Sequence, residues 1–201
     1  MSLAFTIYAL SLVAVAIVAY FLYASFAFGA GYQPTPPAVV RRMLELAQIR
    51  PGETVYDLGA GTGAIVFAAA RSYQARVVGV EVEPLRVLIL RLRTWWGGPR
   101  DRISILWGNI FDTDLRPANV VTAFLWPGAM NRLKPRLENQ LAPGARVVSH
   151  WHPIPGWEPE VVDSGLRVYL YRWPSARTTA PPTPTGDTGT RTQIPPTARG
   201  E

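Results

Sequence analysis

The nine-residue run VYDLGAGTG, at positions 55–63, constrains the fold more than any other part of this sequence. A short apolar segment ends at Asp57, glycines follow at 59, 61 and 63, and an alanine-rich segment begins directly afterwards. Glycines let the backbone turn tightly and let a ligand approach main-chain NH groups at the start of a helix. The run therefore predicts a strand, a ligand-binding turn and a helix in direct succession.

The rest of the chain between positions 38 and 173 alternates short apolar runs with longer stretches that carry apolar residues at helical spacing. This alternation predicts a mostly parallel α/β sheet, and a turn at 163–165 between two apolar runs predicts an antiparallel hairpin at its edge. The predicted helices are 38–49, 63–71, 84–95 and 131–141, and the predicted strands are 53–58, 76–80, 103–107, 120–124 and 145–150, with the hairpin at 161–170.

An acidic residue precedes the glycines, which distinguishes this turn from the GxGxxG turn that binds dinucleotides. A carboxylate at Asp57 would repel a pyrophosphate but could pair with the ammonium of S-adenosylmethionine, directly or through water. Glu81 ends the next predicted strand, 22 residues beyond Gly59, where an acid can accept hydrogen bonds from ribose hydroxyls. Glu83 is a nearby competitor for that role. Asn109 follows the third strand, where its amide could pair with an adenine edge.

Three runs of sequence carry a resemblance to a known family: YQPTPPAVVRRMLELA, VYDLGAGTGAIVFAAA and VVGVEVEP. They resemble the membrane-anchored class I, seven-strand protein-lysine methyltransferases. That family includes the enzymes that act on the adenine nucleotide translocase and the ATP synthase c-subunit, with prokaryotic relatives. The likeness covers about residues 30–173 and extends to the hydrophobic segment before them.

The resemblance implies a Rossmann-like sheet, S-adenosylmethionine as cofactor and a protein lysine as methyl acceptor. It places Thr35 at the methionine end of the cofactor and Glu81 at the ribose. At the third-strand position relatives often carry Asp, whereas this chain has Asn109, which can donate as well as accept a hydrogen bond. The cofactor-binding residues that follow from the motif and the resemblance together are Thr35, Asp57, Gly59, Gly61, Gly63, Glu81 and Asn109.

Aromatic residues after the fourth and fifth predicted strands are candidates for the substrate pocket. Trp126 and Pro127 follow strand four, and Trp151 and Trp157 follow strand five. Aromatic faces can hold a cation and the methyl group beside a sulfonium, so Trp126, Pro127 and Trp151 are predicted to line the pocket. The alternative is that these tryptophans pack the domain or rest at a membrane surface.

Other kinds of chemistry find little support in the sequence. Methyl transfer to an amine needs alignment and desolvation rather than a catalytic triad, and the chain has no cysteine. His150 and His152 have no third ligand near them in the sequence, so no metal site is predicted. The Asn/Asp-Pro-Pro-aromatic motif of enzymes that methylate base nitrogens is missing after strand four, which argues against a nucleic-acid substrate.

The N-terminal segment is uncharged from Met1 to Val40, and the 26 residues from Leu3 to Phe28 are almost wholly apolar. Such a run predicts a single transmembrane helix at 1–28, in preference to a cleaved signal peptide or a buried core helix. Arg41 and Arg42 are the first charged residues, so positive charge on this side of the helix predicts a cytoplasmic domain. The remaining expected units are a linker at 29–37, a methyltransferase domain at 38–173 and a disordered Pro/Thr-rich tail at 174–201.

The sequence is compatible with three functions. The first is methylation of a lysine on a membrane or membrane-proximal protein. The second is methylation of a lipid headgroup amine or a lipophilic small molecule, since an anchored domain meets both. The third is a non-catalytic, cofactor-binding module of a membrane complex.

Overall fold

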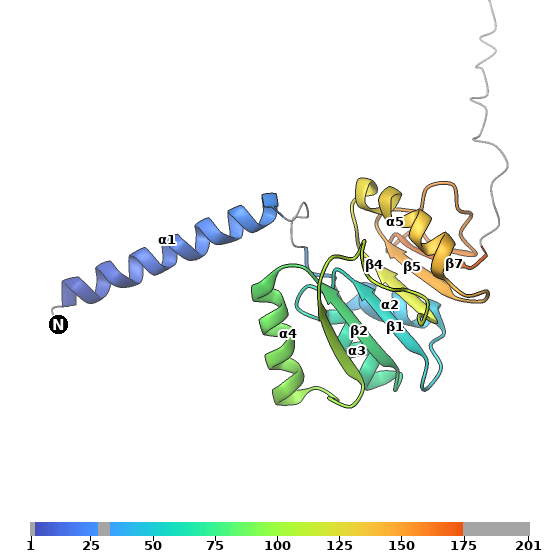
Figure 1. Ribbon diagram of the computed structural model, residues 1–201, viewed down its shortest axis with the longest axis horizontal. Coiled ribbons are helices and arrows are strands. Elements are labelled where there is room, and N and C mark those ends of the chain that lie inside the picture. Colours follow the sequence, from blue (N-terminus) through green and yellow to red (C-terminus); the bar gives the residue numbers. More distant parts are fainter. Residues whose placement is uncertain (1–2, 28–32, 175–201) are drawn as a thin grey trace, which may run out of the picture.

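The computed structural model describes residues 3–27 and 33–174, and its centre is a seven-stranded sheet (Figure 1). The strand order is β3-β2-β1-β4-β5-β7-β6, with β1 to β5 parallel and β7 antiparallel to both of its neighbours. The strands are β1 (Thr54–Leu58), β2 (Arg76–Glu81), β3 (Ile103–Trp107), β4 (Val120–Ala123), β5 (Arg146–His150), β6 (Val161–Asp163) and β7 (Val168–Arg172).

Helices cover both faces of the sheet and create two apolar cores. Helices α2 (Pro37–Ala47) and α3 (Ala64–Ser72) pack on one face, together with Leu90 of α4 (Pro84–Gly97). Helix α5 (Pro127–Gln140) packs on the other face, where Met130, Leu133 and Leu137 are fully buried. Strands β1, β4 and β5 lie in the middle of the sheet and are buried along most of their length, in keeping with the apolar residues at their centres.

Each predicted strand and helix of the domain is present, with small differences at the ends. The largest difference is at α5, which begins at Pro127 rather than at Asn131. Proline suits the first turn of a helix because the NH that it lacks would have no partner there. The predicted hairpin at 161–170 is formed by β6 and β7.

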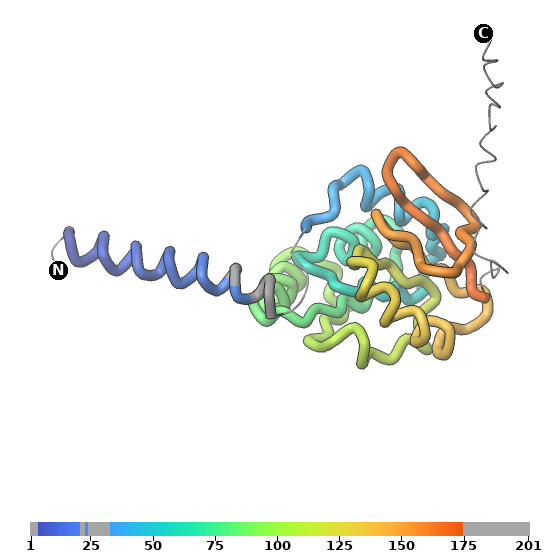
Figure 2. The backbone as a smooth tube through the Cα atoms, turned by 90° about the horizontal axis from the view of Figure 1, so that it is seen from above, coloured from blue at the N-terminus to red at the C-terminus, as the bar shows by residue number. Residues whose placement is uncertain are grey.

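The helix α1 (Leu3–Ala27) projects away from the sheet and its helices (Figure 2). Among the described residues, no helix combines the length and hydropathy that crossing a membrane requires. The predicted transmembrane helix is therefore not confirmed. Residues 28–32, which include the first part of the linker predicted at 29–37, lie outside the described residues, as does the predicted disordered tail at 174–201 apart from Pro174.

Gly63, the last glycine of the turn, has a packing role. It precedes α3 with a φ of 89°, in the left-handed region that favours glycine. A Cβ atom at this position would lie 2.6 Å from Leu90 Cδ2 and 2.7 Å from Phe67 Cε2. Glycine is therefore needed here so that α3 and α4 can approach each other closely.

We expect Gly63→Ala to lower the free energy of unfolding by about 2–4 kcal/mol, because it adds a steric clash to the cost of a positive φ. The matched control is Gly144→Ala, since Gly144 has a φ of 87° and a Cβ added to it would meet no atom within 4 Å. That variant should lose only about 1 kcal/mol. Urea denaturation measures both values, and equal losses would contradict the packing role of Gly63.

Candidate active site

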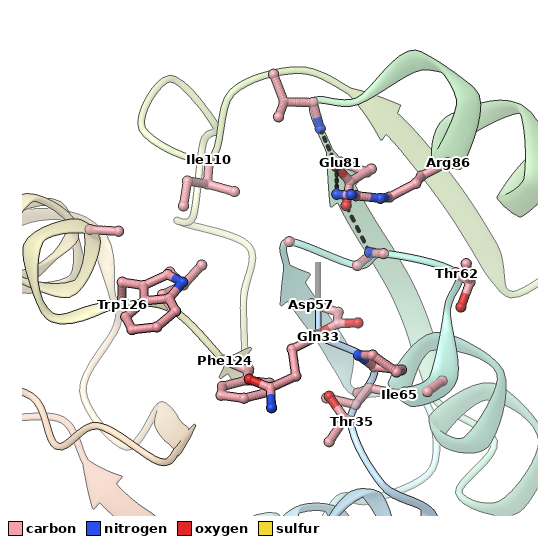
Figure 3. A pocket seen from close by; sticks show the side chains of 18 of the residues that line it. Gln33, Thr35, Asp57, Thr62, Ile65, Glu81, Arg86, Ile110, Phe124 and Trp126 are labelled. Atoms are coloured by element: carbon pink, nitrogen blue, oxygen red, sulfur yellow. Dashed lines mark hydrogen bonds and ion pairs between the residues drawn. The ribbon is translucent and has the colours of Figure 1, made fainter. Parts of the chain in front are cut away.

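A cavity of about 570 Å³ lies beyond the carboxyl ends of β1, β2 and β4 (Figure 3). Ligands of open parallel sheets bind at this position, and the volume is in the range of small-molecule sites. Figure 3 shows Glu81 and Arg86 on one side of the cavity and Phe124 and Trp126 on the other. The residues that line the cavity include Gln33, Thr35, Asp57, Gly59, Gly61, Glu81, Arg86, Asn109, Phe111, Phe124, Leu125, Trp126 and Arg132.

The glycine turn is bonded to the end of β2. The amides of Gly59 and Ala60 both donate to the carbonyl oxygen of Val80, each over 2.9 Å. The amide of Gly61 donates to Oε2 of Glu81 over 2.8 Å. Gly59 and Gly61 have φ values of 81° and 56°, which other residues rarely adopt. The turn therefore takes this shape because it has glycines at these positions.

Glu81 is a buried carboxylate with several donors around it. Besides Gly61, the amide of Glu83 donates to its Oε1 over 3.0 Å, and the guanidinium of Arg86 lies 3.8 Å from the same oxygen. The amide of Val82 also donates to Oε1, over 3.1 Å. These three amides leave about one of the four acceptor positions of the carboxylate free for a hydroxyl of a ribose. Glu83 does not compete for this role, because its side chain caps α4 by accepting from the amides of Leu85 and Arg86.

Asp57 is the second buried carboxylate of the cavity, and only 4% of its surface is exposed. Burial raises the pKa of this carboxyl to about 7, and the nearby charge of Glu81 also raises it. A hydrogen bond from the Thr122 hydroxyl acts in the opposite direction. A cation beside Asp57 would favour its ionised form. The ammonium of a bound amino acid would therefore be stabilised at this position.

The remaining walls come from three segments that are distant in the sequence. Gln33, Pro34 and Thr35 line the cavity directly before α2 begins. Asn109 also lines it, and its Oδ1 accepts a hydrogen bond from the amide of Phe111 over 3.0 Å. That bond leaves the Asn109 amino group as the donor that a base could use. Arg132 of α5 completes this side, with its guanidinium 4.1 Å from the centre of the Phe111 ring.

A narrow side cavity of about 50 Å³ adjoins the main one and shares four lining residues with it. The shared residues are Gln33, Phe124, Leu125 and Trp126, and the side cavity adds Trp151 and His152. The rings of Trp126 and His152 are 5.9 Å apart. Trp151 has a φ of 69°, an unusual conformation for a bulky residue and of the kind that concentrates at functional sites.

The structure brings together most of the residues predicted to bind the cofactor. Thr35, Asp57, Gly59, Gly61, Glu81 and Asn109 line the main cavity together with Trp126. Three predicted residues do not line it, for different reasons. Gly63 is used for helix packing, Pro127 is the first residue of α5, and Trp151 belongs to the side cavity.

Several lining residues had no signal in the sequence. Gln33, Phe124 and Arg132 belong to no recognisable motif, and only the folded chain brings them to one cavity.

Trp157, a further candidate for the substrate pocket, is buried against Tyr171 and Trp173 and is a packing residue. His150 packs on Phe124 with ring centres 4.5 Å apart, and burial lowers its pKa. Within the described residues, no three His, Asp or Glu side chains are grouped closely enough to hold a metal ion.

The sequence matches the family described as the ANTKMT methyltransferase domain, over residues 57–161. The chain belongs to this family. It is 44% identical over 147 residues to a protein-lysine N-methyltransferase of Saccharolobus islandicus, covering 70% of this chain and 91% of the archaeal protein. It is 37% identical over 134 residues to the mouse adenine nucleotide translocase lysine N-methyltransferase, covering 66% of this chain but only 58% of the mouse protein.

A solved structure gives the cofactor class. An RNA methyltransferase from Salinibacter ruber, in complex with S-adenosyl-L-homocysteine, is 38% identical and superposes with a TM-score of 0.67, covering 75% of this chain and 98% of that one. The present domain is therefore a methyltransferase that uses S-adenosylmethionine. Its cavity fits that group, because Glu81 can accept from a ribose hydroxyl, Asp57 can pair with the ammonium, and Asn109 can donate to the adenine base.

We expect Glu81→Gln to weaken binding of S-adenosylhomocysteine by about 1–3 kcal/mol, because it removes a charged hydrogen-bond acceptor. The matched control is Glu83→Gln, which changes a buried carboxylate two residues away that does not line the cavity. Calorimetric titration measures the affinity of each variant. Equal weakening by both substitutions would show that Glu81 supports the fold rather than the ribose.

The raised pKa of Asp57 predicts a pH dependence of stability. The pKa of about 7 in the folded state exceeds the unfolded value, so folding favours the protonated carboxyl. The free energy of unfolding that this adds is fully present below about pH 4 and is lost as the pH rises towards 7. This loss is of the order of 4 kcal/mol for a shift of about three pKa units. The Asp57→Asn variant has no carboxyl to ionise at this position, so its free energy of unfolding should not show this loss. Denaturation of both proteins from pH 4 to 8 tests this, and parallel curves would refute it.

Proposed function

We propose that this methyltransferase transfers a methyl group to the side-chain amine of a lysine in a protein. The observation that carries the proposal is the narrow, aromatic-walled side cavity that opens from the cofactor cavity. The names of the archaeal and mouse relatives, both lysine N-methyltransferases, support the same conclusion. The proposal concerns the acceptor only, since the methyl donor follows from the family.

The side cavity suits a lysine side chain for physical reasons. A lysine has a long, unbranched alkyl chain that fits a narrow space, and its ammonium is attracted to aromatic faces. Phe124 and Trp126 line both cavities and so lie where acceptor and donor would meet.

The reaction needs alignment and the loss of one proton. When bound, S-adenosylmethionine supplies a methyl group on a positively charged sulfur, and S-adenosylhomocysteine remains after transfer. The neutral amine uses its lone pair to form the new bond to carbon as the carbon–sulfur bond breaks. His152 and Gln33 are the polar side chains of the side cavity. We infer that His152 accepts the proton that the amine must lose.

The acceptor class can be tested with tritiated S-adenosylmethionine added to full-length protein in native membranes. We expect label in a protein band, on lysine. Label in the lipid extract would favour a headgroup amine, and label in RNA would match the Salinibacter neighbour, an RNA methyltransferase. No label in any fraction would favour a non-catalytic module.

A substitution in the side cavity should separate transfer from cofactor binding. We expect Trp151→Ala to lower methyl transfer about tenfold, the equivalent of about 1.4 kcal/mol of lost contact with the amine, and to leave S-adenosylhomocysteine affinity unchanged. Trp151→Phe keeps an aromatic face and should retain most of the activity. Parallel losses of transfer and cofactor affinity would mean that the side cavity does not hold the acceptor.

We infer that α1 associates with a membrane and leaves the domain in the cytoplasm. The support lies in the sequence, which has no charge before Arg41 and an apolar run from Leu3 to Phe28. Positive charge following the run favours a cytoplasmic domain. Alkaline carbonate extraction should leave the full chain in the pellet, and protease added outside intact cells should spare the domain. Release by carbonate, or cleavage without lysis, would overturn this inference.

A further inference from the structure

The helix α4 has an apolar outer face in addition to its buried one. Val87 and Leu90 face the core, as in any packed helix. On the opposite side Leu88, Leu92, Trp95 and Trp96 are exposed, and Trp96 has 72% of its surface free. These four residues follow helical spacing, so they form one stripe along the helix. The outward side of a surface helix is ordinarily polar, which makes this stripe an exposed hydrophobic patch.

The patch continues to the edge of the sheet. Strand β3 is an edge strand beside α4, and its last residue, Trp107, is 64% exposed. Trp107 donates from its ring NH to the carbonyl of Val82, next to the start of α4. We define the α4–β3 surface as the exposed residues Leu88, Leu92, Trp95, Trp96 and Trp107.

A positively charged pocket adjoins this surface and shares Trp95 with it. It has a volume of about 260 Å³ and is lined by Arg91, Thr94, Trp95, Arg100, Ile103 and Ile105. The Arg100 guanidinium lies 5.4 Å from the centre of the Trp95 ring and donates to the Trp95 carbonyl. Arg91 makes no ion pair with any residue in the described part of the chain. Two arginines and no acid in the lining make a site for a phosphate group.

The surroundings favour a lipid surface as the partner. An interfacial helix combines tryptophan and leucine with arginine, because aromatic rings and apolar chains enter the headgroup region while cations pair with phosphates. The α4–β3 surface has this composition. The tyrosine hydroxyl of Tyr20 in α1 also donates to Glu83, the residue that caps α4. The apolar helix α1 therefore leaves the domain on the side of α4, as both ribbon and tube views show (Figures 1 and 2).

We propose that the α4–β3 surface docks the methyltransferase domain on an anionic lipid bilayer, with a lipid phosphate bound between Arg91 and Arg100. Leu88, Leu92, Trp95, Trp96 and Trp107 enter the headgroup region. This contact is separate from the active site and from the identity of the methyl acceptor. It gives the domain itself an orientation on the membrane, in addition to any attachment through α1.

Because the chain has no cysteine, a single introduced cysteine can be labelled selectively. Leu88→Cys in the full chain is labelled with an environment-sensitive nitrobenzoxadiazole dye and reconstituted with vesicles. The vesicles contain phosphatidylcholine alone or an equal mixture with phosphatidylglycerol. The matched control is Val162→Cys, because Val162 on β6 at the opposite sheet edge is 48% exposed and Leu88 is 51% exposed. We expect a blue-shifted, brighter signal from position 88 in mixed vesicles only, and no change from position 162.

The role of the two arginines is tested in the labelled Leu88→Cys protein. An arginine near an anionic surface contributes about fivefold to partitioning, so Arg91→Gln with Arg100→Gln should reduce docking about 25-fold and abolish the difference between the vesicles. The matched control, Arg116→Gln with Arg172→Gln, removes the same charge from exposed residues that pair with Asp114 and Glu160. It should preserve the signal.

Three results would overturn the proposal, with flotation of the vesicles confirming that the protein is reconstituted in each case. The first is an equal signal from positions 88 and 162. The second is an equal loss with both arginine pairs, which would indicate only a general effect of net charge. The third is a response of position 88 to single-stranded RNA but not to mixed vesicles, which would assign the surface to nucleic acid. Methyl transfer by the Arg91→Gln, Arg100→Gln variant on a soluble lysine peptide should be unchanged.

Discussion

The bonding of the glycine turn to the end of β2 is the interaction on which the site depends. The carbonyl of Val80 holds Gly59 and Ala60, and the carboxylate of Glu81 holds Gly61. These bonds fix the distance between two neighbouring strand ends and leave open the space between them. Glu81 is therefore a structural acceptor for the turn as well as the residue that we expect to bind the ribose. A change at Glu81 therefore alters the shape of the turn as well as its chemistry.

Much of this arrangement could be predicted from the sequence, because it depends on local patterns. Continuous apolar runs such as 76–80 predict strands buried on both faces, and parallel strands end at one edge of a sheet. Polar residues at two strand ends, Asp57 and Glu81, therefore had to meet. Asn109 had to reach the site for the same reason, and the glycines at 59 and 61 had to accommodate the turn.

The remaining features depend on contacts between distant segments, which the sequence does not reveal. In the sequence Gly63 is indistinguishable from Gly59 and Gly61. The requirement for glycine at position 63 comes from the close approach of the Leu90 and Phe67 side chains. Pro127 could be read as part of a loop or as the first turn of a helix, and only packing decides. Gln33 and Arg132 reach the cavity from segments almost 100 residues apart. For α1, an apolar sequence predicted a membrane span that the described residues do not confirm.

The position of Gln33, Pro34 and Thr35 limits how far the active site can travel. These residues form part of the cavity wall, and only five residues separate Gln33 from the end of α1 at Ala27. Six residue steps of extended chain span roughly 20 Å. The methyl-transfer site therefore stays within a short distance of whatever surface holds α1. It can reach lysines in a thin layer next to that surface and cannot reach those farther out. Target selection would then depend on the height of a lysine above the surface as much as on the sequence around it.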